Sequence, residues 1–321
     1  MIKTDKGFTL VEFLVAFVVS TLLATGLYIA YRSNYRTFNV NQDILEMQMN
    51  ARIAVDTITR SLRLVGFGSK KLYETNHPEG TQYYELEVPD SSFGIDFSSK
   101  LIFFKPGISS NTTTDARSDA IAITYASRYI GKITNVIDEN TVILDDTSRL
   151  STNATKYQKY NIYIYPNPYQ ENQKLLNLAG NTLTFTGRHH ASIDDECYLL
   201  TSNYIHIVDN NLRIDHNIAP SSANNDIADN IEAFQLQIAL DTNNNGVIES
   251  SEWQNTLTDQ EIMQVKGFKI FILAKTKNPD PDFTDKATYI MADQTFGPYN
   301  DHFHRLLLTT TVIPRNLTYK D

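Results

Sequence analysis

One uninterrupted apolar segment near the start of the chain limits what this protein can become. From Phe8 to Ala30 there are 23 residues, and Glu12 is the single charged residue among them. At about 1.5 Å per residue, a helix of this length spans roughly 35 Å, enough to cross the hydrocarbon core of a bilayer. Because Lys3 and Lys6 precede the segment, we expect the short N-terminal end on the cytoplasmic side and the body outside.

Two simpler interpretations of this segment fit less well. A secretory signal peptide has an apolar region of about 7–15 residues followed by a small-residue cleavage site. Here the nearest such site, ATG at residues 24–26, lies inside the apolar run. A plain membrane anchor does not account for an acid five residues into the run, because a charged side chain in the middle of a membrane helix costs about 2.5–3.5 kcal/mol.

The residues at the start of the run carry a family resemblance. The string GFTLVE at residues 7–12 follows a short basic leader and resembles the processing motif of type IV prepilins and pseudopilins. The resemblance implies that residues 1–7 are a prepilin leader and that a membrane peptidase cuts between Gly7 and Phe8. It further implies that Phe8 is then N-methylated and that Glu12 becomes the fifth residue of the mature chain.

Cleavage would also supply a partner for the buried acid. The freed amine of Phe8 would be mostly protonated at neutral pH. By family analogy, Glu12 of one subunit attracts the Phe8 amine of a neighbour as the filament grows. The alternative is a carboxylate near the helix start that snorkels to the lipid headgroups and needs no protein partner.

The helical pattern continues beyond the membrane segment. Apolar or small residues recur at spacings of three and four from Val40 to Val65, which predicts one buried helix face. Gly66 then ends the helix. We predict one continuous helix, with a transmembrane half at residues 8–30 and an amphipathic half at residues 31–66. A coiled-coil dimer is the alternative use of this stripe, but the stripe covers fewer than four heptads.

The remainder, residues 67–321, has the pattern of a β-rich body outside the membrane. Short apolar or alternating runs are separated by turn residues. The predicted strands and hairpins cover residues 120–125, 129–145, 162–165, 204–214, 234–240, 268–273 and 305–312. We therefore predict an α+β fold in which a long N-terminal helix packs on an antiparallel sheet. Residues 150–225, rich in Asn, Ser and Thr, are a candidate β-rich insertion.

Both ends of the body extend the resemblance. ITRSLRLVGF at residues 58–67 and RLLLTTTVIPRN at residues 305–316 are similar to PilW-like minor pilins, as is the strand at residues 231–240. The resemblance implies a structural subunit that helps to initiate or cap a type IV pilus or a related pseudopilus. The implied partners are the prepilin peptidase, other minor and major pilins, the inner-membrane assembly platform and membrane lipid. The implied location is the bacterial inner membrane and then a pilus or another periplasmic or extracellular filament.

A twelve-residue segment late in the body fits the EF-hand calcium loop. The segment is DTNNNGVIESSE, residues 241–252, with glycine at position 6 for the sharp turn. The six ligands by position are Asp241, Asn243, Asn245, the carbonyl of Val247, Glu249 and Glu252. We predict a structural Ca²⁺ site of modest affinity, because three carboxylates contribute and oxygen ligands favour calcium over zinc or copper. The alternative is an Asn-Gly hairpin turn that binds no metal.

Composition argues against several other functions. The net charge of −9 disfavours nucleic acid as the main partner, and the single cysteine, Cys197, excludes an internal disulfide framework. We find no phosphate loop, dinucleotide fingerprint or paired-acid pattern, so we predict no enzyme.

Three alternatives stay open at this point. One is a calcium-dependent tip adhesin or DNA-uptake receptor on a pilin scaffold. Another is a minor pseudopilin of type II secretion, although the large calcium-binding pseudopilin typically lacks the acid that Glu12 provides. The third is an anchored protein that never joins a filament.

Overall fold

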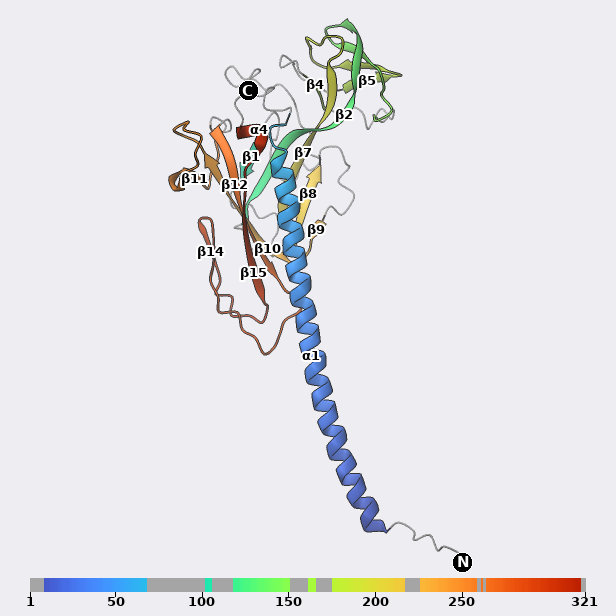
Figure 1. Cartoon of the computed structure of the whole chain (residues 1–321), viewed down its shortest axis with the longest axis vertical. Coiled ribbons are helices and arrows are strands. Elements are labelled where there is room, and N and C mark those ends of the chain that lie inside the picture. Colours follow the sequence, from blue (N-terminus) through green and yellow to red (C-terminus); the bar gives the residue numbers. More distant parts are fainter. Residues whose placement is uncertain are drawn as a thin grey trace, which may run out of the picture.

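The computed structural model describes residues 9–67, 102–105, 118–150, 161–165, 175–216, 226–258, 261 and 264–318. It consists of one long helix and a body of antiparallel strands (Figure 1). This arrangement confirms the predicted α+β class.

Helix α1 (Leu10–Arg63) contains 54 residues, which at about 1.5 Å each make a rod of roughly 80 Å. Its start is fixed by Thr9, whose side chain and backbone exchange hydrogen bonds with Glu12 in a capping box. The last turn of the helix carries the basic residues Arg60 and Arg63. Just beyond the helix, Gly66 adopts a φ of +82°, a conformation that favours glycine. The first half of the helix extends away from the body (Figure 1).

The described strands form two main sheets and one hairpin, and their pairings are all antiparallel. The larger sheet has the order β5-β6-β3-β2-β7-β8-β9, with β1 paired to β2 and β4 paired to β7. Its strands are β1 (Ile102–Lys105), β2 (Ala120–Asp138), β3 (Thr141–Leu144), β4 (Asn161–Tyr165), β5 (Leu175–Ala179), β6 (Thr182–Phe185), β7 (Glu196–Val208), β8 (Asn211–His216) and β9 (Asp226–Ala228).

The smaller sheet has the order β11-β10-β12-β15, and β13 pairs with β14. Its strands are β10 (Ile231–Leu240), β11 (Trp253–Gln254), β12 (Val265–Lys275) and β15 (Arg305–Val312). The hairpin consists of β13 (Tyr289–Met291) and β14 (Gln294–Phe296). A 3₁₀ turn, η2 (Ser250–Glu252), and a short helix, α4 (Arg315–Thr318), complete the described elements.

The main core forms where the second half of α1 lies on the strands. The helix residues buried in it are Met47, Ala51, Ala54, Ile58 and Leu62. They pack with alternate residues of β10 and β12, which point to one face of the smaller sheet. The stripe predicted from Val40 to Val65 therefore packs on the body, and the coiled-coil alternative for these residues is wrong.

A second core lies at the end of the body farthest from the N-terminus (Figure 1). It exists because β2 and β7, with 19 and 13 residues, extend beyond the main core. Its buried residues are Ile130, Ile133, Val142, Leu144, Leu150, Ile162, Ile164, Leu175, Leu178, Leu183, Phe185, Cys197 and Leu199. This core overlaps the candidate insertion at 150–225, part of which lies outside the described residues, and those bounds stay a prediction.

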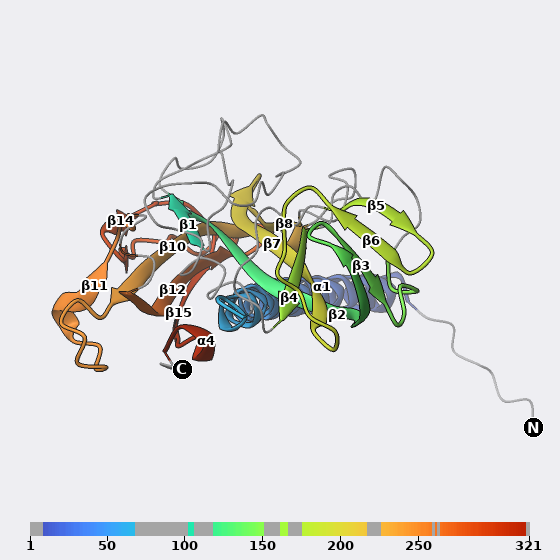
Figure 2. The same ribbon diagram turned by 90° about the horizontal axis from the view of Figure 1, so that it is seen from above.

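Between β12 and β15 the chain makes an excursion, residues 276–304, that the sequence pattern did not predict. Its hairpin buries Met291 and Phe296 against Ala233, Phe271 and Leu273, which point away from the face that α1 covers. The smaller sheet is therefore covered on both faces, by α1 and by the excursion. Figure 2 shows the hairpin and the helix on opposite sides of β12.

Candidate functional site

The predicted assembly acid lies at the free end of α1. The backbone N–H of Thr9 donates to Glu12 Oε2 at 2.9 Å, and the Thr9 hydroxyl donates to the same atom at 2.8 Å. Glu12 N–H returns a hydrogen bond to the Thr9 hydroxyl at 3.3 Å. Both residues are exposed, so the carboxylate is accessible to a partner while it also caps its own helix. Gly7 and Phe8, the predicted cleavage site, lie outside the described residues.

The first half of α1 makes no core contact with the described part of the body. Its large apolar side chains are exposed, with exposed fractions from 48% for Val18 to 81% for Leu10. In the described part of the chain, α1 is the one helix long and apolar enough to cross a membrane. The lipid-facing half predicted at residues 8–30 therefore has no apolar partner among the residues that the structure describes.

A second apolar stripe continues beyond residue 30 on the outer side of α1. We call it the seam; its members are Tyr31, Tyr35, Phe38, Leu45, Met49 and Ile53. At 3.6 residues per turn they fall within roughly 40° of one line along the helix, opposite the buried stripe. Their exposed fractions run from 38% for Ile53 to 67% for Tyr31, and the Tyr31 and Tyr35 rings stack at 6.1 Å.

The seam has the spacing of a coiled-coil contact. The steps from Tyr31 to Tyr35 and Phe38, and from Leu45 to Met49, follow the four-three pattern of a heptad repeat. Above Ile53 the same side of the helix carries Asp56 and Arg60, which pair with each other at 2.6 Å. The seam is therefore an exposed apolar surface of limited length with heptad spacing.

The excursion holds α1 at the lower end of the body. Asp280 accepts a hydrogen bond from Arg36 at 2.8 Å, and Asp282 also pairs with Arg36. Two residues earlier in the loop, Asn278 donates to Asp43 at 3.2 Å. These contacts join the loop to two positions about two turns apart on the helix. The angle between helix and body is therefore fixed outside the main core as well as inside it.

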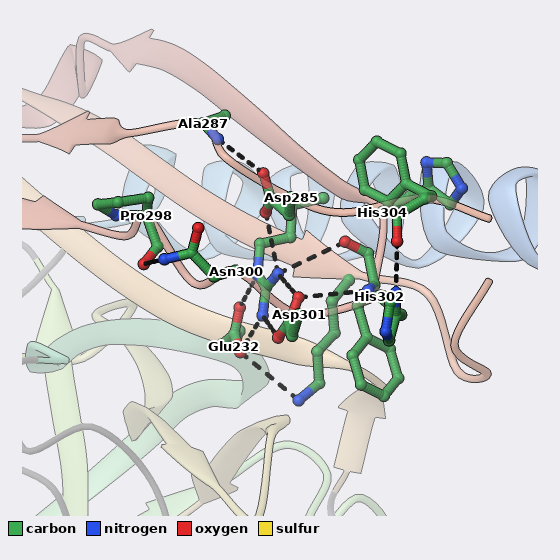
Figure 3. Close-up of polar contacts among 12 residues, drawn as sticks. Glu232, Asp285, Ala287, Pro298, Asn300, Asp301, His302 and His304 are labelled. Atoms are coloured by element: carbon green, nitrogen blue, oxygen red, sulfur yellow. Dashed lines mark hydrogen bonds and ion pairs between the residues drawn. The ribbon is translucent and has the colours of Figure 1, made fainter. Parts of the chain in front are cut away.

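A buried charge network fastens the excursion to the sheet (Figure 3). Arg305, with a side chain 1% exposed, donates to Glu232 at 2.6 Å, to Asp285 at 2.9 Å and to Asp301 at 2.7 Å. Its guanidinium lies 3.6 Å from the ring centroid of Tyr299. The hydrogen bond from Arg305 lowers the pKa of the Asp301 carboxyl. The network therefore holds together three segments that are distant in the sequence.

The predicted calcium loop adopts a compact turn between β10 and β11. Asp241 accepts hydrogen bonds from the backbone N–H groups of Asn245 and Gly246, at 3.0 and 3.1 Å. Glu252 accepts from the N–H groups of Thr242 and Glu249, both at 3.0 Å. Asp241 and Glu252 are each 3% exposed, so the first and last predicted ligands are buried at the base of the loop.

The other predicted ligands lie nearer the tip of the loop. Val247 is 61% exposed, and the Asn245 amide donates to Glu249 at 3.3 Å. Gly246, at the sixth position, has a φ of +77°, as the sharp turn requires. No three His, Cys, Asp or Glu side chains in the described residues are grouped closely enough to hold a metal ion. Three of the six predicted ligands are amide or carbonyl oxygens.

Cys197 lies in the second core and is fully buried. Burial raises the pKa of its thiol, and the charges of Asp195 and Asp145 raise it further. A thiol that is hard to ionise is a poor nucleophile.

Two features of the site were missed by sequence reasoning. The seam has a signal in the sequence, because its aromatic and aliphatic residues already show heptad spacing. The charge network has no signal in the sequence, because Glu232 lies 73 residues from Arg305 and no local pattern links them.

Comparison with known proteins gives two family matches. The family of type IV pilus-assembly protein W matches residues 202–316, somewhat more than a third of the chain. The prokaryotic N-terminal methylation motif matches residues 2–28, which include Gly7, Phe8 and Glu12. Among curated proteins, none matches the chain significantly.

Among solved structures, the chain is similar to a type IV-like pilin from Thermus thermophilus. The alignment has 12% identity and a TM-score of 0.38, and it covers 85% of this chain and 97% of the other. A TM-score of this size does not by itself define a shared fold. The two family matches, at opposite ends of a chain built as a long apolar helix on an antiparallel body, support its identification as a PilW-like minor pilin.

Proposed function

We propose that this minor pilin enters a type IV pilus through the free half of α1 and its seam, and that it helps to initiate or cap the filament. The observation that carries the proposal is the seam, because its apolar side chains are exposed beyond the predicted membrane segment. Exposed apolar surface of this kind marks a protein contact. Chains anchored in one membrane by the same end present their helices in parallel, so the partner is a parallel helix of another pilin.

The order of events follows from the leader and the helix. The prepilin peptidase would cleave between Gly7 and Phe8 while the chain lies in the inner membrane with its N-terminus cytoplasmic. The assembly platform would then bring α1 beside the helices of other minor and major pilins. Glu12, accessible at the free end of α1, is the residue that we propose binds the new N-terminal amine of a neighbour.

A role in initiating or capping the filament is supported by the shape of the body. The second core adds a β-rich unit at the end farthest from the membrane helix (Figure 1). A body of this size fits poorly between close neighbours in a filament wall and is accommodated more easily at an end.

The seam is tested by a pair of adjacent substitutions. Phe38 lies in the seam, whereas Thr37 is also exposed but points roughly 100° away round the helix. We expect Phe38→Glu to reduce the amount of this chain in sheared filaments at least tenfold, since a carboxylate would be placed in an apolar contact. Thr37→Glu should have little effect. Both variants should change the free energy of unfolding by about 0.5 kcal/mol or less, because both sites are on the surface. Equal filament content in the two variants would contradict the role of the seam.

We also propose that residues 241–252 bind one structural Ca²⁺ ion. The proposal is supported by the ordered set of oxygen ligands and by Gly246 at the turn. A hydrogen bond from the Glu249 backbone N–H lowers the pKa of Glu252, which keeps that carboxylate charged at neutral pH. The ion would offset the repulsion among the acids of the loop and connect the end of β10 to β11.

Calcium binding predicts a specific gain in stability. If the dissociation constant lies in the 10⁻⁴–10⁻³ M range of extracellular calcium modules, 10 mM Ca²⁺ should raise the free energy of unfolding by about 1.4–2.7 kcal/mol over EDTA. Thermal unfolding of the full chain measures this gain. Glu252→Gln should abolish it, while Glu261→Gln, outside the loop, should preserve it. The same midpoint in calcium and EDTA, or a gain that persists in Glu252→Gln, would show that the loop is only a turn.

A further inference from the structure

A cleft of about 1160 Å³ lies between α1 and the loop at residues 277–282. One wall is the side of the helix from Tyr28 to Glu46, and the other is the loop from Lys277 to Asp282. The cleft lies on a third side of the helix, between the seam and the buried stripe. It shares Tyr35 with the seam and Val40 with the stripe, while its charged residues belong to neither apolar surface.

The cleft begins where the hydrocarbon core of a membrane would end. This position rests on the proposed function, in which residues 8–30 cross the bilayer. Arg32 and Arg36 then lie about 3 and 9 Å beyond Ala30 along the helix, and the headgroup layer is about 5–7.5 Å thick on each side. Tyr28 and Tyr35 line the cleft on either side of Arg32, as expected for aromatic residues at a membrane interface.

The charge of the cleft nearest the membrane on α1 is positive, and the charged residues farther out are mixed in sign, with four acids against Arg36 and Lys277. Arg32 is nearest the hydrocarbon core; it is exposed and forms no ion pair with any residue that the structure describes. One turn farther out, Arg36 is already paired with Asp280 and Asp282. The Asp282 side chain remains 76% exposed, so its carboxylate is accessible to a second cation.

We propose that this cleft seats the headgroup of a phosphatidylethanolamine-type phospholipid. The lipid phosphate would pair with Arg32, and the primary ammonium at the end of the headgroup would pair with Asp282. The order of charges fits a zwitterionic headgroup whose phosphate is nearer the acyl chains. An anionic headgroup carries no cation that could pair with Asp280 and Asp282. The trimethylated ammonium of phosphatidylcholine has a charge but no N–H, so it could not donate a hydrogen bond to them.

The proposal is tested by lipid retention on the purified, delipidated full chain. The chain in detergent is mixed with phosphatidylethanolamine, phosphatidylcholine or phosphatidylglycerol of equal acyl composition, and bound lipid is counted by native mass spectrometry. We expect phosphatidylethanolamine to be retained up to about fivefold more than either alternative, the range of an exposed ion pair. Arg32→Gln should reduce retention of all three lipids. Asp282→Asn should remove the preference for phosphatidylethanolamine over phosphatidylcholine.

Two exposed residues outside the cleft provide matched controls. Arg52→Gln, higher on α1, and Asp293→Asn, at the β13–β14 turn, should leave retention unchanged. Equal retention of the three lipids, a preference for phosphatidylglycerol, or a preference that survives both cleft substitutions would overturn the proposal. Alkaline extraction of cell membranes tests the anchoring separately. A chain that is released by extraction contradicts the proposed function itself.

Discussion

Replacing Glu12 with alanine is expected to remove this chain from the filament fraction while leaving a folded, membrane-anchored protein. In the proposed assembly, Glu12 meets the Phe8 amine of a neighbouring subunit in an apolar environment. Removing one partner of a buried ion pair costs about 3–5 kcal/mol, which corresponds to a loss of at least about 100-fold in association. Anchoring should not weaken, because an uncharged residue enters the bilayer more easily than an acid.

The capping box requires two further variants, because Glu12 also binds Thr9. Thr9→Ala removes the cap and keeps the charge, whereas Glu12→Gln keeps an oxygen for the cap and removes the charge. If assembly depends on the negative charge of Glu12, the Thr9→Ala variant should still enter filaments and the Glu12→Gln variant should not. The measurement is the ratio of this chain in sheared filaments to that in membranes. If Glu12→Gln enters filaments and Thr9→Ala does not, Glu12 acts only by capping the start of its own helix.

Replacing Arg305 with alanine is expected to destabilise the body more than any surface change. The substitution leaves Asp285, 2% exposed, and Glu232, 13% exposed, without the cation that they share. Breaking a buried ion pair in this way costs about 3–5 kcal/mol in the free energy of unfolding. Arg305→Lys should recover part of the loss, because it restores the charge but not the planar fork of donors. Denaturant unfolding of the full chain measures both effects.

An exposed ion pair on the helix is the matched control for Arg305. Arg60 and Asp56 form a salt bridge in which both side chains are more than half exposed, so Arg60→Ala should cost about 0.5 kcal/mol or less. A cost below about 1 kcal/mol for Arg305→Ala would contradict the importance of the network.

The same network predicts a difference in acid sensitivity. Arg305 lowers the pKa of Asp301 below its ordinary value of 3.8 in the folded protein. The stability that Asp301 contributes is therefore present above about pH 3.8 and is lost as the pH falls through the lower folded value. The wild-type protein should lose this contribution to its free energy of unfolding in acid. Arg305→Ala, which has already lost it, should show a flatter dependence of unfolding free energy on pH in this range.

The elements with a regular period were predictable. The helix expected from residue 8 to 66 begins at Leu10 and ends at Arg63, since a 3.6-residue apolar period continues throughout its second half. The strand at 234–240 lies within β10, and the hairpin at 204–214 contains the ends of β7 and β8. These segments each show their own apolar pattern and turn residues, so no distant contact was needed to predict them.

The excursion at residues 276–304 could not be predicted in the same way. It shows no long period, and its position depends on ion pairs that join it to distant residues. Arg305 reaches Glu232 on β10, and Asp280 reaches Arg36 on α1. The cleft between the loop and the helix follows from those contacts, so it too was beyond sequence reasoning.

The two apolar stripes of α1 show a different limit. Sequence analysis predicted that the stripe from Val40 to Val65 is buried, which the structure confirms for Ala51 and Ile58. It did not identify the seam, although Tyr35 and Phe38 have the necessary spacing. The continuous stripe indicated which side meets the body, but nothing in the sequence showed that the apolar residues on the opposite side stay exposed, and the fold supplies that information.

The chemistry at the start of the chain is the part on which the functional account depends most. Its most direct test is the mass and N-terminal sequence of the chain recovered from filaments. We predict that the recovered chain begins at Phe8 with one N-methyl group and retains all of α1. A chain that still begins at Met1, or one that has lost the apolar half of α1, would contradict the account.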